Sequence, residues 1–189
     1  MQSVETIWEH KQSSQTLVLH VEDRPGVLDR VASVFRRRAF NIQSLSVGPA
    51  ERPGVSRMTV VMQGARAEAH RAEANLRKLI NVLEVENISS IPSVERHLAL
   101  IKIRTNPAGR REILQVCEVF RARVVDIGNQ AMIVESTGTA RKIDGLIEVL
   151  KPFGILEMAC AGAVSMTRGL AASQKAELET GAEEERLAS

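Results

Sequence analysis

Residues 22–28 read Glu22-Asp23-Arg24-Pro25-Gly26-Val27-Leu28 and separate two different hydrophobic periods. Before this stretch, residues 16–22 alternate between apolar and polar positions, which is the period of a half-buried β-strand. After it, apolar residues recur at spacings of three and four, which is the period of an amphipathic helix. Pro25 is tolerated at the start of such a helix because the first turn does not need its missing N–H. The stretch therefore predicts a strand-to-helix junction.

Two more strands and a second helix complete this first unit. Residues 41–48 and 57–63 indicate strands, and the turn-rich residues 49–54 join them as a hairpin with a longer loop. An aliphatic strand is expected over 83–88. Between them, the apolar stripe of a helix consists of Ala72, Leu76, Leu79 and Ile80. The order is strand, helix, strand, strand, helix, strand.

The same order repeats after a short linker. The expected elements are strands over 98–104, 123–127, 131–136 and 155–164, a helix over 111–121, and a helix that Thr139 caps and Pro152 ends. The predicted fold class is α+β, with two ferredoxin-like βαββαβ domains in tandem. The predicted divisions are an N-terminal extension (1–15), a first domain (16–90), a linker (91–96), a second domain (97–168) and an acidic flexible tail (169–189).

Composition narrows the class of protein. The net charge is +2, but the charges are unevenly distributed along the chain. Residues 171–189 form an acidic tail, which contains five Glu and only two basic residues, Lys175 and Arg186. The basic remainder has no Tyr and only five other aromatic residues, so a nucleic-acid interface built on stacking is a minor alternative. No run of about 18 apolar residues is present, and the first fifteen residues lack the apolar stretch of a signal peptide, so we expect a cytoplasmic protein. Cys117 and Cys160 are expected to be buried, reduced thiols.

Catalytic and metal-binding patterns are missing from the sequence. The four histidines are scattered, and no nucleophile elbow, zinc-ligand pair or glycine-rich phosphate loop follows a predicted strand. A half-buried structural role is expected for His20, which lies in the first strand. We therefore predict a protein with no catalytic residue, no metal site and no cofactor of its own.

The junction has the chemistry to bind a free amino acid. Gly26 lets a ligand approach the backbone, and the N–H groups of residues 26–28 at a helix start favour a carboxylate. Asp23 can take the ammonium group, and Asn41 offers an acceptor and two donors. Val27 and Ile42 suit an aliphatic side chain. In the plainer interpretation, Asp23 only caps the helix, Gly26 relieves a tight turn and Asn41 holds a turn.

The pattern Asp23-x-x-Gly26 resembles the signature of the ACT domain, a βαββαβ module that binds small amino acids. Residues 40–47 (Phe-Asn-Ile-Gln-Ser-Leu-Ser-Val) and 56–59 (Ser-Arg-Met-Thr) are similar to the small subunit of acetolactate synthase. The second half, from Glu95-Arg96-His97 onward, also resembles this family, so the resemblance covers 16–168. The effector-binding residues that it implies are Asp23, Gly26, Val27, Leu28, Asn41 and Ile42. Some members carry Asn where this chain has Asp23.

The resemblance also implies a function and partners. Members of this family support a separate large catalytic subunit, which carries thiamine diphosphate, magnesium and FAD, and they make it sensitive to valine, leucine or isoleucine. We expect a homodimer of the first domains, because an open sheet edge is commonly closed by a second copy. The alternative is a free-standing ACT sensor that regulates another enzyme or a transcription factor.

Overall fold

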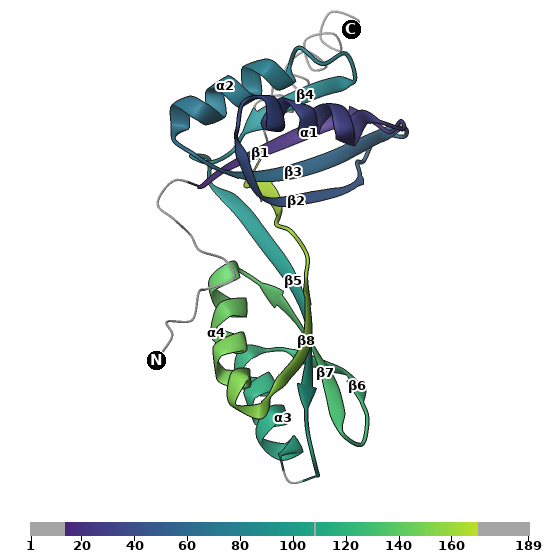
Figure 1. Cartoon of the computed structure of the whole chain (residues 1–189), viewed down its shortest axis with the longest axis vertical. Helices are drawn as coiled ribbons and strands as arrows, with labels where there is room; N and C mark the ends of the chain where they lie inside the picture. Colours follow the sequence, from purple (N-terminus) through teal and green to yellow (C-terminus); the bar gives the residue numbers. More distant parts are fainter. Residues whose placement is uncertain (1–13, 108, 170–189) are drawn as a thin grey trace, which may run out of the picture.

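The computed structural model describes residues 14–107 and 109–169, which form two α+β units at the two ends of an elongated molecule. A long strand, β5 (Ser93–Arg104), runs from one unit into the other (Figure 1). The chain returns beside it, because the short strand β9 (Val164–Thr167) pairs with the first residues of β5.

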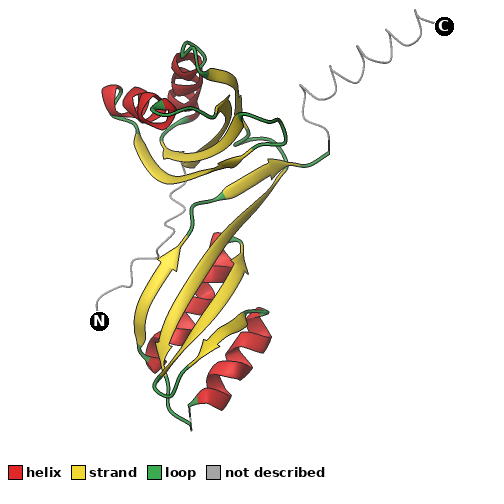
Figure 2. Ribbon diagram, turned by 90° about the vertical axis from the view of Figure 1, so that its right-hand side faces the viewer, coloured by secondary structure: helices red, strands yellow, loops and turns green. Residues whose placement is uncertain are grey.

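The N-terminal unit is a four-stranded antiparallel sheet covered by two helices on one face (Figure 2). Its elements are β1 (Ser14–Glu22), α1 (Val27–Arg37), β2 (Asn41–Pro49), β3 (Val55–Gln63), α2 (Arg66–Leu76) and β4 (Val82–Asn87). The strand order is β2-β3-β1-β4, which leaves β2 and β4 at the edges. Helix α1 contacts β2, and α2 contacts β4.

The C-terminal unit repeats this topology. Its other elements are α3 (Arg110–Phe120), β6 (Arg123–Ile127), β7 (Ala131–Gly138), α4 (Ala140–Leu150), the short 3-10 helix η1 (Lys151–Phe153) and β8 (Ile155–Cys160). The strand order β6-β7-β5-β8 matches that of the first unit, element for element. The predicted tandem of ferredoxin-like βαββαβ folds is confirmed.

Each unit has its own hydrophobic core between sheet and helices. In the first, Leu17 and Leu19 of β1 pack with Val31 and Phe35 of α1. In the second, Ile101 of β5 packs with buried residues of α3 and α4. Burying a side chain of this size stabilises the fold by about 1.5–3 kcal/mol, so the alternation read from the sequence fixes which face of each strand turns inward.

Three elements differ from expectation. Helix α2 ends at Leu76, and Ile80 is 84% exposed rather than part of the apolar stripe, because residues 77–81 form turns that break the helical period. The expected strand over 155–164 is two strands, β8 and β9, since the chain bends at residues 161–163. Strand β5 begins at Ser93, so most of the expected linker is extended and paired with β9.

Smaller expectations have mixed outcomes. Thr139 caps α4 as predicted, with its side chain accepting a hydrogen bond from the Lys142 N–H. Cys117 is buried, but Cys160 is only half-buried, and both are free thiols. No helix among residues 14–107 and 109–169 is long and apolar enough to cross a membrane. The last two residues of the expected N-terminal extension, Ser14 and Gln15, belong to β1, and the rest of it and nearly all of the acidic tail lie outside the described residues.

Candidate functional site

Gly26 lies at the N-cap of α1 in a left-handed conformation, with φ of +82°. This conformation favours glycine, and no atom beyond the adjoining residues Pro25 and Val27 lies within 4 Å of the place where a Cβ would be. The space in front of the backbone is therefore open. The Val27 N–H donates to the Arg24 carbonyl at 3.4 Å. Within the described residues, the N–H groups of Gly26 and Leu28 have no backbone partner and can donate to a ligand.

Asp23 is exposed beside this helix start, and its backbone is fixed. Its N–H donates to the Gly54 carbonyl at 2.8 Å, which ties the junction to the β2–β3 loop. Helix α1 has no side-chain cap, so the interpretation that Asp23 merely caps the helix is wrong. The Asp23 carboxylate therefore remains available for a cation.

A polar network around the junction was not foreseen from the sequence. Asn81, in the turn before β4, donates from its side chain to Glu22 at 2.7 Å and accepts from Arg30 at 2.7 Å. Arg24 lies 3.4 Å from the same Glu22. These contacts join residues up to 59 positions apart in the sequence, so no local sequence pattern predicts them. They direct both arginines toward Glu22 and Asn81 rather than toward Asp23.

Val27 and Leu28 face opposite ways. The Val27 side chain is buried in the core, so its backbone, not its side chain, is accessible at the junction. Leu28 is 45% exposed and is the apolar side chain that the junction presents to solvent. The expectation that the Val27 side chain faces an aliphatic ligand is therefore wrong, because that side chain is part of the core.

Asn41 and Ile42 start β2, at the other end of the sheet. Asn41 pairs with Gln63, which also pairs with Ser14 at the beginning of β1. At the opposite end, Pro49 pairs with Ser56, next to the Glu22 end of β1. With a rise of about 3.3 Å per residue, the two ends of β2 are roughly 25 Å apart. One chain therefore does not bring Asn41 and Ile42 together with Asp23 and Gly26.

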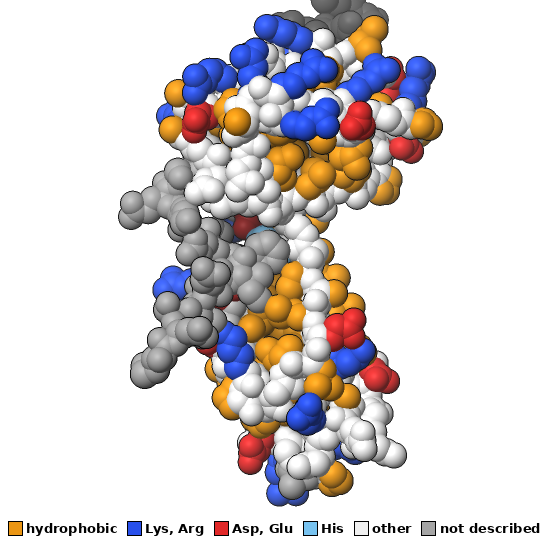
Figure 3. Space-filling view, in the orientation of Figure 1, with side chains coloured by type: hydrophobic (Ala, Val, Ile, Leu, Met, Phe, Trp, Pro, Cys, Tyr) orange, Lys and Arg blue, Asp and Glu red, His pale blue; other side chains and the backbone are white. Residues whose placement is uncertain are grey.

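The edge strand β2 is accessible in part, because residues 162 and 163 of the same chain lie against Ser44 and Leu45 near its middle. Val47 on β2 is 46% exposed. Figure 3 shows hydrophobic side chains gathered over the strands of the N-terminal unit, below a row of Lys and Arg side chains on its helices. An unpaired strand edge with apolar side chains is typical of a surface that another chain covers.

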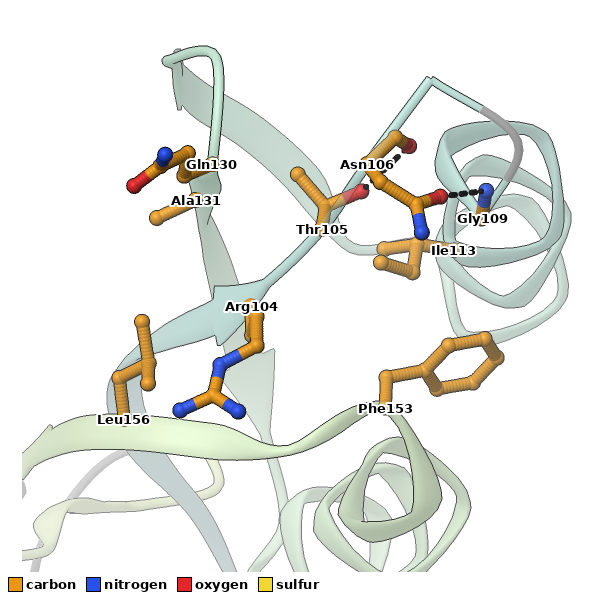
Figure 4. Close-up of a pocket in the computed structure, with 9 residues that line it drawn as sticks. All are labelled: Arg104, Thr105, Asn106, Gly109, Ile113, Gln130, Ala131, Phe153 and Leu156. Atoms are coloured by element: carbon orange, nitrogen blue, oxygen red, sulfur yellow. Dashed lines mark hydrogen bonds between the residues drawn. The ribbon is translucent and has the colours of Figure 1, made fainter.

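The equivalent junction in the second unit, between β5 and α3, encloses a hollow of about 590 Å³ (Figure 4). Its lining residues are Arg104, Thr105, Asn106, Gly109, Ile113, Gln130, Ala131, Phe153 and Leu156. Sequence reasoning assigned no role to this junction. The sequence offered one signal for it: this junction follows the first full strand of the second unit, as the Asp23 junction follows the first strand of the first unit.

Comparisons with known proteins agree with these two units. A family model described as an AHAS small subunit-like ACT domain matches residues 17–84, and one described as the small subunit of acetolactate synthase matches residues 96–169. The acetolactate synthase small subunit of Mycolicibacterium smegmatis is 45% identical over 156 residues, which cover 82% of this chain and 92% of the relative. The chain belongs to the acetolactate synthase small-subunit family.

This family is found in archaea as well as bacteria. The probable acetolactate synthase small subunit of Archaeoglobus fulgidus is 44% identical over 154 residues, covering 82% of this chain and 96% of the relative. The crystal structure of the Thermotoga maritima acetolactate synthase small subunit superposes with a TM-score of 0.79 at 35% identity, covering 84% of this chain and 99% of that one. The family and the tandem fold expected from the sequence are confirmed.

Proposed function

We propose that this chain is the regulatory, non-catalytic small subunit of an acetolactate synthase, a transferase complex that makes branched-chain amino-acid precursors. The observation that carries this is the match of both units to one family, over residues 17–84 and 96–169. A free-standing ACT sensor accounts for the first match only. The partner is a large catalytic subunit in the cytoplasm, to which we assign thiamine diphosphate, magnesium and FAD.

The effector is a branched-chain amino acid, valine or leucine, bound at the α1 junction. Its carboxylate accepts hydrogen bonds from the Gly26 and Leu28 N–H groups, where the helix dipole favours an anion. Its ammonium group pairs with Asp23, which is exposed and does not cap the helix. Leu28 and Ile42 supply the apolar contacts. Binding at this place stabilises one assembly geometry of the complex over another.

Two copies of the chain complete the site. If two β2 edges pair antiparallel about a two-fold axis near Leu45, Asn41 of one protomer lies opposite Pro49 of its partner. Pro49 is at the junction end of the sheet, beside the loop whose Gly54 carbonyl accepts from Asp23. Pairing in this way brings Asn41 and Ile42 of one protomer toward Asp23 and Gly26 of the other, which accounts for their separation within one chain.

Mixing two inactive variants tests the shared site. Gly26→Asp places a carboxylate where the ligand carboxylate binds, and Asn41→Ala removes the amide, so each variant alone is expected to lose valine binding. After subunit exchange, half of the dimers are mixed and hold one complete site each. Calorimetry should then detect about one quarter of the wild-type number of valine sites per chain. If the mixture binds no valine while the wild type does, the site lies within one chain.

Reconstitution with the large subunit tests the regulatory role. Adding this chain to the purified large subunit should raise acetolactate formation and make it sensitive to valine, and Gly26→Asp should keep the stimulation while losing the valine response. Lysine serves as the control effector, because a cationic side chain does not suit the apolar contacts of Leu28 and Ile42. Acetolactate formation by this chain alone would contradict a non-catalytic role.

A further inference from the structure

The hollow of the C-terminal unit is bounded by backbone that its own hydrogen bonds hold in place. The Arg104 N–H donates to the Gly154 carbonyl at 2.9 Å, and the Thr105 N–H donates to the Gln130 carbonyl at 2.9 Å. Next to the lining residue Gly109, the Arg110 guanidinium donates to the carbonyl of Gly128 at 2.6 Å. These hydrogen bonds hold the backbone at Arg104 and Thr105 in place without a ligand, and the volume of the hollow is within the range of small-molecule sites.

Two polar side chains of the lining, Arg104 and Asn106, offer donors. Arg104 makes no ion pair and no side-chain hydrogen bond within residues 14–107 and 109–169, and its guanidinium lies between Leu156 and Phe153 (Figure 4). The Asn106 Oδ1 accepts from the Gly109 N–H at 2.8 Å, which orients the amide so that its Nδ2 donors face away from that bond. The Thr105 hydroxyl is already used, since it donates to the Asn106 carbonyl.

The remaining wall is apolar, and it contains no acid. Ile113, Phe153 and Leu156 line it, and none of the nine lining residues is Asp or Glu. A single guanidinium binds one carboxylate through two parallel hydrogen bonds, whereas an ammonium group would find no counter-charge in the lining. The Asp23 junction differs in this respect, because it offers a carboxylate.

We propose that this hollow is a second ligand site, which binds a small aliphatic carboxylate without an ammonium group, such as a branched 2-oxo acid. The carboxylate pairs with Arg104 and accepts from the Asn106 amide, and the aliphatic part lies against Phe153 and Leu156. The chain then carries two sites of opposite selectivity at equivalent positions of its two units. This proposal is independent of the effector proposed for the first unit.

Calorimetry on the full chain with 3-methyl-2-oxobutanoate as the probe tests it. The wild type should bind saturably, and Arg104→Gln should weaken binding by about tenfold or more, since a charge-assisted pair is lost. Arg141→Gln is the matched control, because Arg141 is an exposed arginine of α4 outside the lining. Gly26→Asp should leave binding of this probe unchanged, which separates this site from the Asp23 junction.

Two further probes define the ligand class. Valine has the same carbon skeleton with an ammonium group in place of the oxo group, and it should not compete for this site in the Gly26→Asp background. Inorganic phosphate should not compete either, because it has no aliphatic part. Absence of saturable binding by the wild type, equal binding by Arg104→Gln, or competition by valine or phosphate would each overturn the proposal.

Discussion

At the scale of single residues, the two thiols have different surroundings. Cys117 is 4% exposed on the inner face of α3, and Cys160 is half-buried at the end of β8. Burial raises the pKa of both thiols above the usual range, since the thiolate is the form that loses hydration. We expect labelling by a thiol reagent to be slower than for a free cysteine and to accelerate as the pH rises toward the raised pKa. The variant Cys117→Ser keeps only Cys160, which is more exposed and should be labelled faster. The variant Cys160→Ser keeps only the buried Cys117, which should be labelled more slowly. Equal labelling rates of the two variants under conditions where the protein is folded would contradict this.

At the scale of elements, helix α4 packs against the second sheet through the buried side chains on one of its faces. Leu146 is fully buried there, whereas Val149 on the same helix is 43% exposed. Leu146→Ala should lower the free energy of unfolding by about 2–4 kcal/mol, because it leaves a cavity that neighbouring side chains fill only partly. Val149→Ala is the matched control and should lower it by less than about 1 kcal/mol. Urea unfolding of both variants measures the difference, and similar losses would show that α4 does not pack as described.

At the scale of the whole molecule, a hydrogen bond links the returning segment at residues 161–163 to the first sheet. The buried Ala163 N–H donates to the Ser44 hydroxyl of β2 at 2.9 Å, across 119 positions. A Cβ added to Gly162 would lie 2.8 Å from the Leu45 carbonyl, so the approach requires glycine. Ser44→Ala leaves the N–H unpaired and should destabilise this contact by about 1–3 kcal/mol. Hydrogen exchange at Ala163 should then be faster, while Ser46→Ala, on the same strand, should leave it unchanged; no change in Ser44→Ala would mean that the contact does not hold the units together.

Local sequence patterns were enough to predict the two α+β units and the junction between Asp23 and Gly26. Hydrophobic period and turn chemistry act over a few residues, so they identified β1, α1, β6 and the cap at Thr139 without any knowledge of contacts. The same local signals did not place the end of α2. Leu79 and Ile80 continue an apolar period, but the chain has already turned after Leu76.

The way in which these parts meet depends on tertiary contacts. Strand pairing places Asn41 at the opposite end of the sheet from Gly26, which no spacing along the chain reveals. The bend at residues 161–163 depends on a partner in β2, and the network through Asn81 depends on side chains from β1, α1 and the turn before β4. The hollow beside Arg104 likewise needs residues of β5, α3, β7 and β8 to lie close together. The physical reason is the same in each case: periodicity reports which face of an element is buried, whereas the contact made by a polar group depends on what folding brings within hydrogen-bond distance.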